Sequence, residues 1–360
     1  MVVAGDIEVV SIPFAAGTVL AAFLSSVPFF GDTHLIVSAI SLYLSALSLL
    51  LICRADSGRG SIAPTFLLLG FFCFLSYSSM PLHSGPHPFF GRCASALQAT
   101  IDSIPFSDSV CNALLRALLS GDRSGLDRRV SELFRASGAS HILALSGLHL
   151  GIIYMVISKI LSLFGNSPLA HKLRSLTIVC FSGFFTLMSG GNPSTVRAWL
   201  FISLGEIAAC DPEREKNPLR VLLTALTIQL LFKPTVVTEL GFQLSYLAMC
   251  GIFLVHPLLE SFYPDDGPAF NPLRRIWTGA SLSISCQIFT APLVWMRFRT
   301  FPRFFLICNL LAMPLTTAIM VSALATTALS GLGICPGALV NCTEFLVKTL
   351  LTVLEIICSM

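Results

Sequence analysis

The sequence predicts an all-α polytopic membrane protein with about eleven transmembrane helices and one amphipathic external segment. Of its 360 residues, 54% are hydrophobic and only 11% are charged, whereas soluble domains usually carry about 25% charged residues. The mean hydropathy is +0.82. A soluble fold of this size has too little interior for so much apolar surface, but lipid can solvate it. The apolar residues are also grouped in runs of about 20, the length that crosses a bilayer.

Each apolar run is expected to form one spanning helix, with one exception. The runs lie at about 9–30, 35–53, 62–80, 139–163, 173–190, 194–210, 218–233, 241–260, 276–296, 303–331 and 337–358. The run at 303–331 is too long for one ordinary span and contains Pro314, so we expect either a kinked helix or two half-helices. The first run follows Asp6 and Glu8 without any Lys or Arg. It therefore lacks the basic region of a cleavable signal peptide and is expected to remain as a helix.

Residues 81–137 have a different composition from the rest of the chain. Leu114, Leu115, Leu118 and Leu119 fall at helical spacing in this segment. Charged residues surround them: Arg92, Asp102, Asp108, Arg116, Asp122, Arg123, Asp127, Arg128, Arg129, Glu132 and Arg135. This pattern predicts a water-exposed connection that contains one or two amphipathic helices. The membrane surface is one place where such helices can lie. The chain is thus divided into N-terminal transmembrane helices (1–80), an external loop (81–137) and a second transmembrane domain (138–360).

The basic residues of the short loops predict the orientation. One side of the membrane collects Arg54, Arg59, Lys172, Arg174, Arg214, Lys216, Arg220, Arg274 and Arg275. Short cytoplasmic loops carry an excess of Lys and Arg. We therefore expect the N-terminus in the cytoplasm and residues 81–137 outside.

Polar side chains inside apolar runs are costly, so each is a candidate functional residue. In residues 140–151, Ser146 and His149 are three residues apart and share a helix face. Gly147 and Gly151 form a small-xxx-small pair that permits close helix packing. Three interpretations remain open for the Ser–His pair: helix packing, a polar face that lines a path, and a catalytic pair. The last is the weakest, because neither an oriented base nor an oxyanion hole is evident.

The stretch 189–198 joins two apolar runs and contains Arg197. Pro193 suits the first position of a helix, and the preceding glycines allow a tight turn. Arg197 lies one turn into that helix. Its guanidinium can meet a phosphate or a carboxylate, or it can extend to the membrane interface.

Three further polar residues complete the candidate site. Gln243 and Tyr246 share a helix face, which fits an interhelical hydrogen bond or a pore lining. Asn309 lies near Pro314 in the run that is expected to be broken, and broken helices at membrane depth usually line a cavity. No nucleotide-binding or metal-binding motif occurs, and none of the 12 cysteines forms a CxxC pair. We therefore expect no cofactor, no metal, no ATPase and no enzymatic activity.

Five short segments, taken in order, resemble the ComEC-like competence-domain family over roughly residues 115–335. They are GDRSGL (121–126), HILALSGLH (141–149), PSTVRA (193–198), GFQLSY (241–246) and NLLAMP (309–314). The resemblance implies a bacterial inner-membrane channel that passes single-stranded DNA into the cytoplasm during natural transformation. The DNA path or pore lining would then include Arg123, Ser146, His149, Arg197, Gln243, Tyr246 and Asn309.

The resemblance also implies partners. These are single-stranded DNA, the lipid bilayer, and a separate DNA receptor, nuclease and cytoplasmic motor protein. Full-length family members carry an external OB-like domain and a metallo-β-lactamase-like nuclease domain. Residues 81–113 are too few for the first, and no His/Asp cluster follows the last apolar run. We therefore expect this chain to match the membrane core alone, with strand degradation in another chain.

Two other functions fit the composition. A small-solute or lipid-linked transporter predicts an inverted repeat with paired broken helices, whereas the sequence offers a single candidate at 303–331. An intramembrane hydrolase would use Ser146 and His149.

Overall fold

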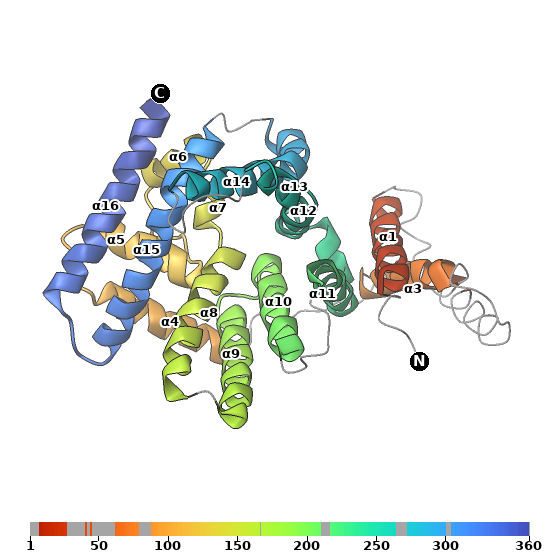
Figure 1. Cartoon of the computed structure of the whole chain (residues 1–360), viewed down its shortest axis with the longest axis horizontal. Helices are drawn as coiled ribbons and strands as arrows, with labels where there is room; N and C mark the ends of the chain where they lie inside the picture. The colour runs from red at the N-terminus through yellow and green to blue at the C-terminus, as the bar shows by residue number, and fades with distance from the viewer. Residues whose placement is uncertain are drawn as a thin grey trace. The chain divides into compact units, whose positions relative to one another are not determined.

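The computed structural model contains helices and no strands in the residues that it describes (Figure 1). These residues are 7–26, 40, 41, 44, 62–78, 88–165, 167–209, 217–263, 272–299 and 304–359. The apolar run at 35–53 lies almost wholly outside them. The helices group into two compact units, residues 1–85 with 200–245 and residues 86–199 with 246–360. These units describe packing, and the topological division at residues 80 and 137 stays a prediction.

In its described residues, the first unit contains three helices and a short 3₁₀ helix of its own. They are α1 (Ile7–Ser25), α3 (Ile62–Ser78), α11 (Pro218–Phe232) and η4 (Pro234–Thr238). Two further helices contribute residues to both units, α10 (Pro193–Ala209) and α12 (Leu240–Leu254).

Two glycines bring α1 and α3 into very close contact. A Cβ on Gly17 would lie 1.9 Å from the Leu67 carbonyl oxygen, and a Cβ on Gly70 would lie 2.1 Å from that of Phe14. Helices in lipid associate through such small residues because the hydrophobic effect gives them no drive to pair. Glycine is therefore required at both positions for this crossing.

The second unit contains the remaining helices. They are α4 (Pro88–Asp102), α5 (Ser109–Ser120), α6 (Arg128–Ala136), α7 (Ser140–Leu143), α8 (Gly147–Leu161), η3 (Ser162–Phe164), α9 (Pro168–Met188), α13 (His256–Glu260), α14 (Pro272–Phe298), α15 (Phe305–Gly331) and α16 (Gly337–Ser359).

Proline marks the start of several helices, as the sequence indicated for α10. Helix α9 begins at Pro168 and α11 begins at Pro218, and in α11 the side chain of Asn217 also accepts the Leu219 N–H at 3.0 Å. Proline is well suited to the first turn because its missing N–H would have no helical partner there. Before α10, Gly190 and Gly191 have φ angles of 88° and 63°, so the tight turn does use the conformational freedom of glycine.

The amphipathic segment is built into the core of the second unit. Helices α4, α5 and α6 all lie within it, and the four leucines of α5 are fully buried. They belong to one hydrophobic cluster with residues of α15 and α16, among them Ile319 and Leu350. The helix predicted from the spacing of these leucines is therefore confirmed. The leucine face of α5 packs against the two C-terminal helices.

The run at 303–331 forms one continuous helix. Helix α15 has 27 residues and keeps Pro314 inside it. The alternative of two half-helices is thus wrong. Helices α15 and α16 lie side by side (Figure 1), and the hydroxyls of Thr326 and Thr343 meet across them at 3.2 Å.

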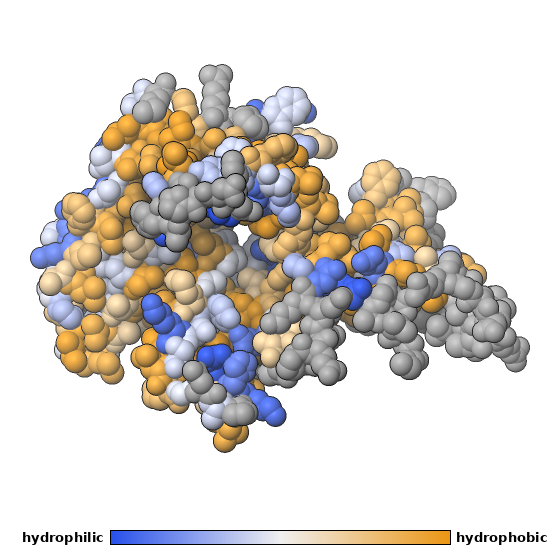
Figure 2. Space-filling view, viewed as in Figure 1, coloured by the Kyte–Doolittle hydropathy of each residue, from blue (hydrophilic) through white to orange (hydrophobic). Residues whose placement is uncertain are grey.

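Among the described residues, five helical segments are long and apolar enough to cross a membrane. They are Ile7–Ser25, Gly147–Phe164, Leu240–Glu260, Pro272–Phe298 and Phe305–Gly331. Helices α3, α10 and α11 have 15 to 17 residues, and α16 carries Glu344, Lys348 and Glu355. The count of about eleven spans is therefore not confirmed. Hydrophobic side chains cover much of the surface in view (Figure 2), as expected for a protein that lipid surrounds.

Candidate functional site

The turn after α5 requires a glycine. Gly121 ends α5 with a φ of 80°, and its N–H donates to the Ala117 carbonyl. A Cβ at this position would lie 2.5 Å from Cδ1 of Leu145. Both the backbone conformation and the contact with Leu145 therefore disfavour a larger residue. The contact ties the start of the GDRSGL segment to the chain just before α8.

Asp122 joins this turn to the helices beside it. Its carboxylate accepts the Ser124 N–H at 3.0 Å and forms an ion pair with Arg116, which also contacts Asp102 at 3.2 Å. The hydrogen bonds from Ser124, together with Arg116, hold the pKa of Asp122 below its usual range. The neighbouring Arg123 is exposed, and it forms no ion pair within the described ranges.

Two other arginines of residues 81–137 differ from Arg123. Arg128 pairs with Glu132 at 3.1 Å, and Arg129 pairs with Glu355 at 3.2 Å. Their charges are therefore partly neutralised within the chain, which leaves Arg123 the better placed of these to attract a phosphate.

The expected helix over 139–163 is interrupted. Helix α7 ends at Leu143, and α8 begins only at Gly147. Ser146 is the N-cap of α8: its hydroxyl accepts the Leu148 N–H at 3.3 Å, and Nδ1 of His149 accepts the Ser146 N–H at 3.3 Å. This is a capping box, which satisfies two N–H groups at the start of the helix.

Ser146 and His149 do meet, as their spacing indicated. Oγ of Ser146 lies 3.1 Å from Nδ1 of His149. His149 is 1% exposed, and its Nε2 has no hydrogen-bond partner among the described atoms. A capping role accounts for the Nδ1 contact.

Gly151 does not provide the close approach that the small-xxx-small pattern predicted. No atom outside its own helix backbone lies within 4 Å of a Cβ built there. Gly147 does have close neighbours, but they are Nη2 of Arg197 at 3.1 Å and Cβ of Ala198 at 3.5 Å. The packing prediction is therefore wrong for Gly151, and at Gly147 the neighbour is a charged side chain.

Arg197 is buried rather than extended to a membrane interface. It is 8% exposed, and its guanidinium carbon lies 6.0 Å from the ring centroid of Tyr246, which is also 8% exposed. A guanidinium at this distance from an aromatic face gains a cation–π interaction. Helices α8, α10 and α12 thus bring a glycine, a cation and an aromatic ring together.

Gln243 and Asn309 each have a hydrogen-bond partner within their own unit. Gln243 is half-buried and donates from Nε2 to the Val237 carbonyl at 2.9 Å, within the first unit. Asn309 donates to Oγ of Ser283 at 3.4 Å, from α15 to α14. Its buried Oδ1 has no hydrogen-bond partner in the described part of the chain. Because α15 is continuous, the broken-helix argument no longer supports Asn309 as a cavity residue.

The structure therefore brings together two pairs of the seven expected residues. Ser146 contacts His149, and Arg197 contacts Tyr246. Gly147 joins the pairs, since it follows Ser146 in the chain and lies against Arg197. The sequence analysis did not assign Gly147 this role, and no local signal reveals a partner 50 positions away.

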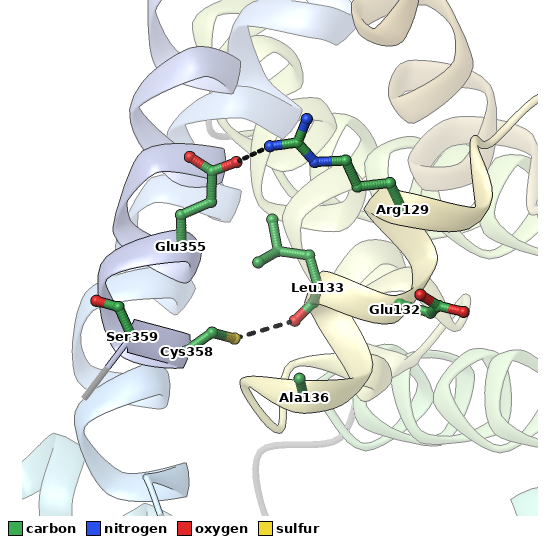
Figure 3. Close-up of a pocket in the computed structure, with 7 residues that line it drawn as sticks. All are labelled: Arg129, Glu132, Leu133, Ala136, Glu355, Cys358 and Ser359. Carbon is green, nitrogen blue, oxygen red and sulfur yellow. Dashed lines mark hydrogen bonds and ion pairs between the residues drawn. The ribbon is translucent and has the colours of Figure 1, made fainter.

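A shallow groove lies elsewhere in the second unit, between α6 and the end of α16 (Figure 3). Its volume is about 460 Å³. In Figure 3 the side chains of Arg129 and Glu355 point toward one another, and Sγ of Cys358 lies 3.7 Å from the Leu133 carbonyl. None of the seven expected residues lines this groove. Within the described residues, no group of three His, Cys, Asp or Glu is placed to hold a metal ion.

Comparison with known proteins identifies the family. The family model described as Competence protein matches residues 118–360. The chain belongs to the Competence protein family. The match contains all seven residues of the candidate site, together with both contact pairs.

Curated relatives are similar to the chain over part of their length. ComE operon protein 3 of Bacillus subtilis (strain 168) is 25% identical over 204 residues, which cover 57% of this chain and 24% of the relative. Recombination protein 2 of Haemophilus influenzae is 23% identical over 217 residues, 58% of this chain and 27% of the relative. An uncharacterised protein of Aquifex aeolicus is 29% identical over 193 residues, 52% of this chain and 44% of the relative. The aligned part thus spans between a quarter and a half of these relatives. No solved structure matches the chain.

Proposed function

We propose that the chain is the membrane part of a DNA-uptake channel that passes a single strand into the cytoplasm during natural transformation. The observation that carries this proposal is the Competence protein match over residues 118–360. The name of one relative, Recombination protein 2, agrees with a role in handling DNA. The channel lies in the bacterial inner membrane, with the N-terminus in the cytoplasm and residues 81–137 outside.

The chemistry of the second unit supports this assignment. A single strand needs cations for its phosphates and aromatic rings for its bases. Arg197 and Tyr246 supply one of each, both buried and 6.0 Å apart. Arg123 adds an exposed positive charge on the segment that we place outside. In this proposal the chain contributes passage of the strand, and a nuclease, a DNA receptor and a cytoplasmic motor act together with it.

Transformation of the source organism tests the proposal. Charged hydrogen bonds contribute about 1.5–3 kcal/mol, so loss of the Arg197 charge is expected to reduce transformation about tenfold or more. The variant Arg197→Gln should show this loss, and Arg197→Lys should retain part of the activity. Arg128→Gln is the matched control, because Arg128 is exposed and already paired with Glu132.

The competing functions predict other outcomes. If the Arg197→Gln variant were present at normal protein levels and transformed at the wild-type frequency, Arg197 would not belong to the DNA path. If purified protein in liposomes took up small anionic solutes but no labelled single strand, a solute transporter would be the better assignment. Labelling of Ser146 by an active-site serine probe would favour a hydrolase.

A further inference from the structure

The first residue of α8 lies against the guanidinium of α10. A Cβ on Gly147 would be 3.1 Å from Nη2 of Arg197, which is closer than about nine in ten Cβ contacts in proteins. The other neighbour is Cβ of Ala198, at 3.5 Å. Gly147 therefore leaves room for the guanidinium, and any side chain there would displace it.

The start of α8 is itself held in place from several directions. The capping box fixes Ser146 and His149. Leu145, the residue before Ser146, is 5% exposed. Its Cδ1 lies 2.5 Å from the position that a Cβ on Gly121 would occupy. Gly147 thus belongs to a segment whose position is set by the GDRSGL turn on one side and by the helix cap on the other.

We propose that Gly147 is a positioning residue, which sets where the Arg197 guanidinium lies above the Tyr246 ring and thereby lets it bind a phosphate of the strand. This inference rests on the proposed function. It links three of the segments in the family resemblance, because Gly121 lies against Leu145, and Gly147, two residues after Leu145, lies against Arg197.

The expected effect of a methyl group at position 147 is specific. The atom it meets is the far end of a long side chain, so the fold can accommodate it by moving the guanidinium a few tenths of an ångström or more. That motion changes the contact with Tyr246 and with any bound phosphate. Gly147→Ala is therefore expected to act as a weaker form of Arg197→Gln while the protein still folds.

The salt dependence of single-strand binding measures this effect of the methyl group directly. The measurement is binding of fluorescent oligothymidylate to purified protein in lipid nanodiscs at a series of KCl concentrations. Each phosphate contact contributes about 0.7 to the slope of log K against log salt for a single strand. Arg197→Gln is expected to lower the slope by about 0.7. Gly147→Ala should lower it in the same direction, with no further decrease in the double variant.

Gly151→Ala is the matched control. It places the same methyl group one turn later in α8, where no atom outside the helix backbone lies within 4 Å of it. This variant should keep the wild-type slope. A wild-type slope in Gly147→Ala would overturn the inference, as would an effect that adds fully to that of Arg197→Gln.

Failure of the proposed function gives a different result. If wild-type protein bound no single strand, the DNA role would be lost. Thermal unfolding of the same variants would then test only the contact between Gly147 and Arg197. Shifts in Tm for Gly147→Ala and Arg197→Gln that do not add in the double variant would retain Gly147 as the residue that positions the guanidinium. Additive shifts would overturn that contact as well.

Discussion

Replacing Gly251 with alanine is expected to separate α12 from α14. A Cβ on Gly251 would lie 2.2 Å from the Ser285 carbonyl oxygen and 2.8 Å from its carbonyl carbon. Both atoms belong to the backbone of α14, so no side-chain rotation relieves the overlap. The helices must therefore move apart by roughly 1 Å in a closely packed region, and such overpacking costs about 1–3 kcal/mol.

Thermal unfolding in detergent, followed with a thiol-reactive dye, measures this cost. The dye labels exposed cysteines such as Cys335 in the folded protein, and unfolding adds to this signal because Cys111 and Cys308 are 1% and 0% exposed until the protein unfolds. For a domain of 150–250 residues, 1 kcal/mol corresponds to about 2–4 °C in Tm. Gly251→Ala is therefore expected to lower Tm by several degrees.

The control is again Gly151→Ala, which adds the same methyl group to a helix without a close neighbour. Alanine is favoured over glycine in a helix by up to about 1 kcal/mol. This control should unfold at or slightly above the wild-type temperature. If Gly251→Ala behaved in the same way, the close approach of α12 and α14 would be refuted.

Two further predictions concern the turn after α5. Gly121→Ala is expected to destabilise the protein by about 1–3 kcal/mol, because alanine must adopt a φ of 80° and its Cβ meets Leu145. Asparagine tolerates this φ better than alanine, so Gly121→Asn separates the backbone strain from the overlap with Leu145. Equal Tm values for the two variants would contradict the argument from backbone strain. Because the pKa of Asp122 is lowered in the folded protein, its contribution to stability is present above the usual aspartate pKa of about 3.8 and is lost as the pH falls through the lower folded value. The Tm difference between wild type and Asp122→Asn should therefore shrink in acid, and a difference that stays constant from pH 7 to pH 3 would argue against this carboxylate.

Features that depend on near neighbours in the chain could be predicted from the sequence. Apolar runs predicted most of the helices, and Pro193 after two glycines predicted the start of α10. Such signals are local because a helix is built from hydrogen bonds between residues four apart. The same reasoning failed where the local signal was ambiguous, as in the uninterrupted α15 with Pro314 inside it.

By itself, the sequence determined that this is a helical membrane protein and which five segments resemble a competence domain. Only the tertiary structure decided which polar residues meet. It paired Arg197 with Tyr246, placed Gly147 against the guanidinium, gave Asn309 a partner in Ser283, and buried the α5 leucines beside α15. These contacts join residues far apart in the chain. They depend on how whole helices pack, which no periodicity or cap within one helix specifies.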